Sequence, residues 1–198
     1  RYIELLDKYG KYKDDIQWHF HPMSHYKEAH RAGKSYEHSE TLYQILSRRI
    51  IDRNFFPSVF RAGCVTERPD ANWFLEQWIP FDCSNFAVEN ENKEQYRDQR
   101  NGQAGDWRRA PSDWRIYHPD FYDYQKEGGC HRSIGRFLNI VSRYGNITSY
   151  EIEKAFQRAN EGLPTLLGIF NHDFRNMGNE IEYFCDLLYD ISRKYNNV

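Results

Sequence analysis

The feature that most constrains the fold of this chain is an alternation of short strand-like and helix-like segments. The strand-like segments are brief apolar runs, whereas the others repeat apolar residues every three to four positions, as an amphipathic helix does. The expected strands are 16–20, 58–61, 81–84, 116–117, 137–141 and 164–170, and the expected helices are 2–9, 40–53, 70–78, 148–161 and 181 to the C-terminus. Strands that alternate with helices predict an α/β domain with a mainly parallel sheet.

The length of the chain favours one domain. A chain of 198 residues is long enough to bury about 70% of its unfolded surface and short for two domains. The segment from about 86 to 113 contains the polar run ENENKEQYRDQRNGQAGDWRRAP, from Glu89 to Pro111. Such a run is typical of a long surface loop. We therefore expect a single domain over residues 1–198, with a polar loop excursion at about 86–113.

Composition argues against several classes of protein. Lys and Arg number 27 against 29 Asp and Glu, a formal net charge of -2, which argues against a dedicated nucleic-acid binder. No apolar run approaches the roughly 20 residues of a membrane span, and Arg1 to Lys13 lacks the apolar stretch of a signal peptide. The four cysteines lie far apart, which favours isolated, mostly buried thiols in a reduced compartment. These features predict a cytoplasmic protein without a membrane span and leave the oligomeric state open.

Polar and charged side chains follow several of the expected strands. In parallel α/β folds, ligands bind outside the carboxyl ends of the strands. The candidates are His21 and His25 after the first visible strand, Arg61 and Gly63 after the next, Asp82 within the third, and His172 after the last. We expect these residues to gather at one rim of the sheet.

Three histidines in the sequence WHFHPMSH, at His19, His21 and His25, predict a metal site. On a strand, His19 and His21 point to the same face, and on a following helical turn His21 and His25 are neighbours. Either pair can bind one divalent cation, zinc being the expected ion, through neutral imidazole nitrogens. A hydrolytic zinc site also needs a third protein ligand, and no nearby acid is an obvious one.

Arg61 and His172 each have a functional and a structural interpretation. A fixed Arg61 guanidinium can orient a carboxylate or bind a ligand anion, or it can form a surface salt bridge. His172 can act as a general acid, because imidazole titrates near neutral pH, or it can be a hydrogen-bonded core histidine. Asp82 can equally cap the loop after its strand.

Several segments resemble the polysaccharide deacetylase family. The segment His21-Pro-Met-Ser-His25 resembles that family's H-x-x-x-H metal motif, and Phe60-Arg-Ala-Gly63 resembles its arginine motif. The stretch from Phe74 through Ser84 is similar to the family's helix-then-strand segment. The segment Leu167-Gly-Ile-Phe-Asn-His172 resembles its final strand with the catalytic histidine. The matches occur in the family's order and cover most of the chain.

The resemblance implies a distorted (β/α) barrel and a divalent metal, often zinc, bound by one aspartate and two histidines. It implies hydrolysis of an acetyl group from an N-acetylated sugar of a glycan or glycan precursor, for example in capsule or O-antigen assembly. By the same resemblance, His21 and His25 are metal ligands, with His19 as an alternative member of the pair. His172 is the general acid and Arg61 orients the catalytic base.

Two aromatic residues near the polar excursion, Trp114 and Tyr117, are candidates for stacking on the sugar. Their alternative fate is ordinary packing. Aromatic residues make up 17% of the chain, so most of them must lie in the core.

The chain departs from the family pattern at two places. The family's paired aspartates follow a first strand, and this chain begins after the position of that strand, so we expect that strand and its aspartate motif to be missing. Asp14 and Asp15 precede the second strand and cannot replace them. Arg61 is followed by Ala-Gly rather than by the usual proline. The resemblance therefore leaves open whether this fragment is active.

Two other functions fit the same residues. A non-catalytic glycan-binding module on the same fold would explain the absent aspartates. An amidohydrolase-type barrel would also place an H-x-H pattern after a strand. It requires a later lysine and an aspartate after the last strand, where Asp173 stands.

Overall fold

The computed structural model describes residues 4, 8, 10, 15–21, 40–89, 105–140, 146–172 and 176–195. Within this part of the chain, the sheet has the order β1-β2-β3-β4-β5, and every neighbouring pair is parallel. The strands are β1 (Trp18–Phe20), β2 (Val59–Ala62), β3 (Phe81–Asn85), β4 (Ser133–Asn139) and β5 (Gly168–Phe170). The helices are α2 (Glu40–Arg53), α3 (Pro69–Trp78), α5 (Ser149–Asn160) and α6 (Gly178–Ser192), with a short 3-10 helix, η3 (Gly63–Val65). The predicted α/β class with a parallel sheet is confirmed.

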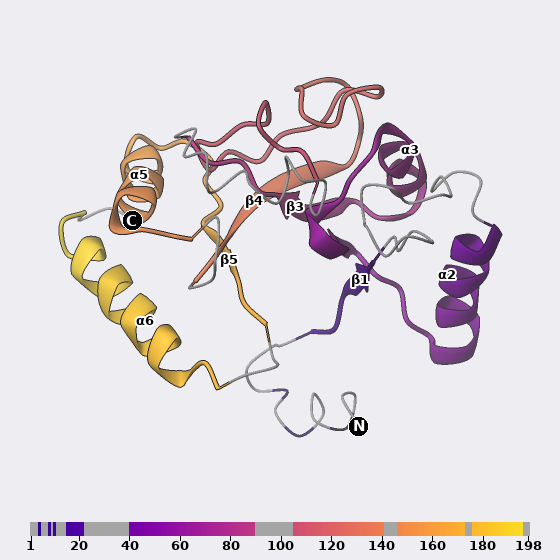
Figure 1. The fold of residues 1–198 in the computed structure, drawn as a ribbon, viewed down its shortest axis with the longest axis horizontal. Coiled ribbons are helices and arrows are strands. Elements are labelled where there is room, and N and C mark those ends of the chain that lie inside the picture. The colour runs from indigo at the N-terminus through magenta and orange to yellow at the C-terminus, as the bar shows by residue number, and fades with distance from the viewer. Residues whose placement is uncertain are drawn as a thin grey trace.

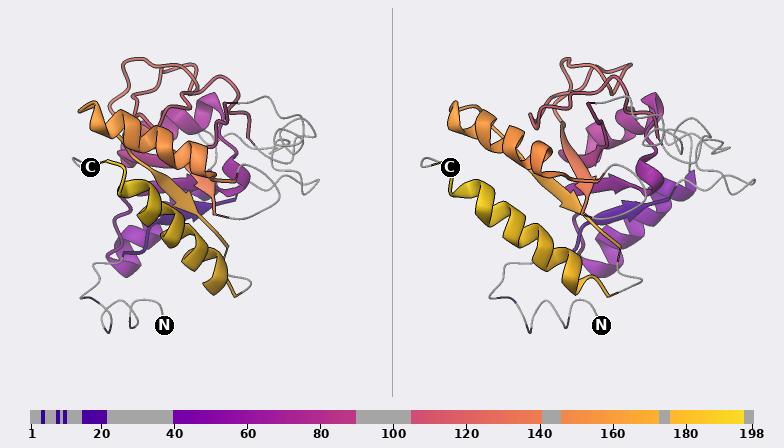
Figure 2. Two further views of the ribbon diagram at one scale, coloured as in Figure 1. Left: turned by 90° about the vertical axis from the view of Figure 1, so that its left-hand side faces the viewer. Right: turned by 60° about the vertical axis from the view of Figure 1, so that its left-hand side comes forward.

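Each strand of the sheet lies beside the strand that follows it in the sequence. Figures 1 and 2 show the strands in the middle of the molecule, with α2 and α3 on the side of β1 to β3 and α5 and α6 on the side of β4 and β5. Because all neighbouring strands are parallel, their carboxyl ends lie at the same edge of the sheet. This edge is where the sequence predicts a site.

Helix boundaries follow from local signals in the sequence. Pro69 occupies the first turn of α3, where its missing N–H would have had no partner in any case. The Thr148 side chain caps α5 by accepting from the backbone N–H of Glu151 at 3.3 Å. The carboxylate of Glu151 binds Arg136 on β4 instead of returning to the Thr148 backbone. Only half of the capping box is therefore formed.

The strands differ more from expectation than the helices do. The helix predicted at 40–53 is confirmed, whereas β4 begins at Ser133 rather than 137 and β5 at Gly168 rather than 164. The expected strand at 116–117 is reduced to one antiparallel bridge between Tyr117 and Ile134. Apart from Glu4 and Lys8, the helix predicted over 2–9 lies outside the described residues.

The core has two parts. In one, α2 and α3 cover β1 and β2 with Trp18, Leu46, Phe60, Phe74 and Leu75. In the other, the segment 105–124 and α5 cover β4 with Trp107, Trp114, Tyr117, Ile134, Leu138 and Ile152. Residues 86–88, 107 and 110, near the two ends of the predicted loop excursion over 86–113, are buried in the core. Residues 90–104 of it lie outside the described part.

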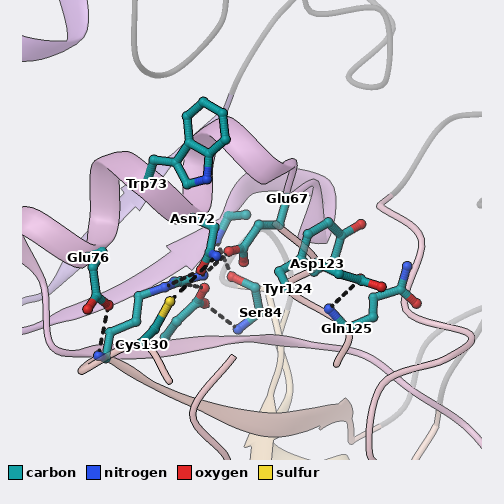
Figure 3. Close-up of polar contacts among 12 residues, drawn as sticks. Glu67, Asn72, Trp73, Glu76, Ser84, Asp123, Tyr124, Gln125 and Cys130 are labelled. Carbon is teal, nitrogen blue, oxygen red and sulfur yellow. Dashed lines mark hydrogen bonds and ion pairs between the residues drawn. The ribbon is translucent and has the colours of Figure 1, made fainter. Parts of the chain in front are cut away.

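A buried polar cluster joins α3 to β3 and to the start of β4 (Figure 3). Arg132 donates from Nη1 to Oδ2 of Asp82 at 2.8 Å and from Nε to Oδ1 of Asn72 at 2.9 Å, and its Nη2 pairs with Oε1 of Glu67. Each of these four residues is at most 3% exposed. The cluster therefore confines two carboxyl groups and one guanidinium away from water.

The Glu67 carboxyl of this cluster has a raised pKa. Burial raises the pKa of Glu67 well above its usual range, Arg132 lowers it, and Asp82 raises it further. Its Oε2 atom has no hydrogen-bond partner among the described residues. A proton on Glu67 would allow this carboxyl to donate a hydrogen bond to Asp82.

We expect Glu67→Gln to preserve the cluster, because a neutral amide has nearly the shape of a protonated carboxyl. An acid with a higher pKa in the folded state than in the unfolded state destabilises the protein once it must ionise. The loss of stability begins as the pH rises above the pKa of the unfolded state, about 4.3 for glutamate, and grows until the pH reaches the pKa of the folded state. Glutamine removes that cost, so the free energy of unfolding of Glu67→Gln, relative to the unsubstituted protein, should increase from pH 4 to pH 8. Urea unfolding across this range measures it. Glu161→Gln, at an exposed position, is the control. If the difference in the free energy of unfolding between Glu67→Gln and the unsubstituted protein did not change with pH, the raised pKa of Glu67 would be contradicted.

Candidate functional site

Two histidines face each other at the carboxyl end of β1. His19 is the register partner of Arg61 on β2, and His21 directly follows β1. The Nε2 atoms of the two histidines lie 2.9 Å apart, with their ring planes at 85°. The other ring nitrogen of His19, Nδ1, lies 2.8 Å from the backbone carbonyl oxygen of Arg61. The structure therefore brings together two of the three histidines predicted to bind metal.

The Arg61 carbonyl determines which nitrogen of His19 carries the proton. A carbonyl oxygen only accepts, so Nδ1 of His19 donates to it and Nε2 keeps its lone pair. In the neutral pair, Nε2 of His21 then donates to Nε2 of His19. Burial and the neighbouring His19 lower the pKa of His21, which favours its neutral form. Nδ1 of His21 lies 3.9 Å from Sγ of Cys64, so the thiol offers a partner when the His21 proton moves to Nδ1.

The spacing of the two Nε2 atoms can be compared with that of two ligands on one zinc ion. Two nitrogens that are each 2.0–2.1 Å from zinc lie about 3.3 Å apart at a tetrahedral angle. The observed separation of 2.9 Å reaches that value with a small rotation of the rings. Among the residues that the structure describes, no group of three or more His, Cys, Asp and Glu is arranged around a metal position. His25 lies outside them, at a position the structure leaves undescribed.

The backbone after β2 is shaped to receive His21. A Cβ atom at Gly63 would lie 2.6 Å from Cα of His21 and closer still to two atoms of its ring, so only glycine leaves room for the histidine. The next two residues, Cys64 and Val65, have positive φ angles of 53° and 47°, which is an unfavourable conformation for a β-branched residue. The carbonyl of Cys64 accepts from the N–H of Gly105 at 3.0 Å, and the carbonyl of Val65 accepts from Nε1 of Trp107 at 2.7 Å. These bonds hold the strained turn in place.

The Arg61 side chain reaches from β2 to residues of β3 and β5. Its Nη1 donates to the carbonyl of Cys83 at 2.7 Å, and its guanidinium carbon lies 3.5 Å from the ring centre of Phe170 on β5. Burial lowers the pKa of Arg61 to about 10, against the opposing effects of Cys83 and Asp82, so the group stays charged at neutral pH. The contact joins β2 to β5, although β3 and β4 lie between them in the sheet order. The guanidinium is therefore held by contacts with β3 and β5.

His172 reaches the same region from β5. It stands two residues after Phe170, and the two rings are 6.1 Å apart at 71°. The side chain is exposed, unlike a core histidine. Phe170 therefore contacts both Arg61 and His172, and it links these two predicted residues across the sheet.

Three other predicted residues lie away from this rim. Asp82 is the register partner of Phe60, so it faces α3, where it binds Arg132 and accepts from the N–H of Ser84 at 2.7 Å. Trp114 and Tyr117 are buried in the core. The indole of Trp114 donates to the Glu151 carbonyl, and the hydroxyl of Tyr117 donates to the Tyr124 carbonyl. Neither ring offers a face to solvent, so the structure does not place them where they could stack on a sugar.

Sequence reasoning missed Cys64 and Phe170 as members of the site. The position of each residue next to a predicted site residue could have identified both of them. Cys64 directly follows the Phe-Arg-Ala-Gly motif, and Phe170 precedes His172 by two positions. All four cysteines are free: Cys83 and Cys130 are buried, whereas Cys64 and Cys185 are exposed. The expectation of mostly buried thiols is therefore wrong for two of them. Burial raises the pKa of Cys83 to about 12, so this thiol is inert at neutral pH.

Comparison with known proteins gives no relative: no family model, curated protein or solved structure matches this chain. A search of the described helices for one long and apolar enough to cross a membrane finds none.

Proposed function

We propose that this chain is a metal-dependent hydrolase that removes an acetyl group from an N-acetylated sugar of a glycan or glycan precursor. The proposal includes a distorted (β/α) barrel to which the parallel sheet belongs. The observation that carries it is the His19–His21 pair, whose Nε2 atoms converge at 2.9 Å at the carboxyl end of β1. The order of the strands and the contact of Arg61 with Phe170 across the sheet support the same fold.

In this proposal His19 and His21 bind a divalent cation, with His25 as a further candidate ligand, and zinc is the expected metal. When bound, the metal would lower the pKa of a water molecule and polarise the acetyl carbonyl. The Arg61 carbonyl keeps Nδ1 of His19 protonated and orients its ring. Cys64 lies where it can accept from Nδ1 of His21.

Arg61 and His172 have separate roles in the proposed reaction. The Arg61 guanidinium is a fixed positive charge beside the histidine pair, and it would orient the carboxylate of a catalytic base or stabilise developing negative charge. His172 is exposed at the end of β5 and would protonate the amine as the C–N bond breaks. The leaving amine needs this proton because an amide anion is a poor leaving group.

The test is zinc binding by titration calorimetry, together with acetate release from N-acetylated oligosaccharides. We expect saturable binding near one equivalent, and at least a roughly 100-fold loss of affinity in His19→Ala and in His21→Ala, since each removes a ligand. His131→Ala is the matched control, because that histidine is exposed and lies away from the site. Binding that survives both substitutions would refute the proposed ligands. Glycan binding without zinc binding would support the non-catalytic module instead.

A further inference from the structure

A second concave site lies in the segment that separates β3 from β4. Residues 109–113, 115 and 125–127 line a cleft of about 480 Å³, a volume within the range of small-ligand sites. The backbone carbonyl of Trp114, which lies between the lining residues Asp113 and Arg115, accepts from the N–H of Leu166 just before β5. Arg158 in the last turn of α5 pairs with Asp113. Tyr117, just beyond the wall, bridges to Ile134 near the start of β4. The lining also contacts the sheet directly, because Asn85 at the end of β3 donates to the Pro111 carbonyl and Arg136 on β4 donates to the Ser112 carbonyl. None of the lining residues is His19 or His21.

Ion pairs hold the walls of the cleft in place. Arg115 binds Asp113 on its own segment through Nε and Glu127 on the facing segment through Nη1, both at 2.8 Å. Arg109 donates to both carboxylate oxygens of Asp123, at 2.8 and 3.2 Å. A site whose charged side chains are already oriented loses less conformational entropy when a ligand binds.

The charge of the lining is uneven. It contains three cationic side chains and two carboxylates. Arg109 and Arg115 are both paired with acids. Lys126 is exposed. It is the one cation of this lining for which no ion pair is found among the described residues, although its charge contributes to lowering the pKa of nearby Asp123. An anionic group on a ligand would therefore find its partner at Lys126.

The lining also limits the kind of ligand. No aromatic side chain lines the cleft, so it offers no surface for a nucleobase to stack on. The carboxylates of Asp113 and Glu127 are acceptors that suit hydroxyl donors, and Ala110 and Pro111 supply a small apolar surface. A ring that carries both hydroxyls and one negative charge satisfies all three features.

We propose that this cleft binds a sugar residue that carries a carboxylate, with the carboxylate at Lys126 and the sugar hydroxyls at Asp113 and Glu127. This inference rests on the proposed function in one respect, since it takes a glycan as the substrate class. It adds that the glycan is acidic and that the protein holds it at a second position, away from the His19–His21 pair.

The test is a titration of the ¹⁵N-labelled protein with methyl β-glucuronide, methyl β-glucoside and inorganic phosphate, followed by backbone amide NMR shifts. We expect saturable shifts with the glucuronide, confined to residues 109–127, and at least tenfold weaker binding of the glucoside and of phosphate. Glucoside binding as tight as glucuronide binding would overturn the role of the carboxylate. Equally tight phosphate binding would show a general anion site and overturn the sugar.

The matched variants are Lys126→Glu and Lys194→Glu, which change the net charge equally on exposed side chains. Lys126→Glu should weaken glucuronide binding at least tenfold, whereas Lys126→Arg and Lys194→Glu should bind as the unsubstituted protein does. An equal loss in Lys126→Glu and Lys194→Glu would overturn the inference. The same titration on His19→Ala separates this inference from the proposed function. Unchanged glucuronide binding supports the cleft even if the protein binds no zinc. A loss of glucuronide binding would show that the binding depends on the His19–His21 pair and would overturn a separate site in the cleft.

Discussion

Gly63→Ala is expected to disrupt the histidine pair and with it zinc binding. The added Cβ would lie 2.6 Å from Cα of His21 and against its ring. Because one of these contacts is to backbone, a change of side-chain rotamer cannot relieve it, and the end of β1 must move away from β2. We expect zinc affinity to fall by about 10- to 100-fold, as when the support of a metal ligand is lost, and the free energy of unfolding to fall by about 1–3 kcal/mol.

Gly129→Ala is the matched control, because a Cβ there meets no atom within 4 Å. Its stability should stay within about 0.5 kcal/mol of the unsubstituted protein, with unchanged zinc affinity. Calorimetric titration and urea unfolding of both variants measure the two effects. Zinc affinity in Gly63→Ala equal to that in Gly129→Ala would mean that His21 does not pack against Gly63 in the metal-binding state.

The predicted site residues that lie together are those whose position follows from strand topology. In a parallel sheet the carboxyl ends share one edge, so the places of His21, Arg61 and His172 follow once the strands are found. The sequence does not show which way a side chain in a strand faces until the register is known. Asp82 illustrates this, since its register partner is Phe60. It therefore faces α3 and Arg132 rather than the opposite face of the sheet, where the Arg61 side chain lies.

The errors in the predicted fold come from polar and aromatic residues whose burial depends on distant partners. β4 begins earlier than predicted because it includes Arg136, which lies in the core, bound bidentately to Glu151. An arginine in an apolar run looks like the end of a strand when its partner, 15 residues later, is not known. The same difficulty applies to Trp114. The guanidinium carbon of Arg136 lies 4.2 Å from the centre of the Trp114 ring, and the sequence around Trp114 does not show whether its ring is buried in this way or exposed to solvent.

Arg132→Met is expected to be the most destabilising of the substitutions considered, lowering the free energy of unfolding by about 3–5 kcal/mol. The methionine fills much of the volume but leaves the Asp82 carboxylate buried without its cation and removes the donors to Asn72 and Glu67. A domain of this kind is stable by only about 5–15 kcal/mol, so the loss is a large part of the total. Arg108→Met removes a surface pair with Asp106 and should cost no more than about 1 kcal/mol.

The reason for this difference is the missing counter-charge, so removing the charge on Asp82 as well should recover part of the loss. We therefore expect Arg132→Met with Asp82→Asn to be more stable than the sum of the two single effects predicts, in a double-mutant cycle followed by urea unfolding. Arg132→Lys, which keeps the charge but loses the forked geometry, should lie between the unsubstituted protein and Arg132→Met and remain measurable if the methionine variant does not fold. Additive effects in the cycle, or equal stabilities of Arg132→Met and Arg108→Met, would show that the Arg132–Asp82 pair does not stabilise the join between α3 and the sheet.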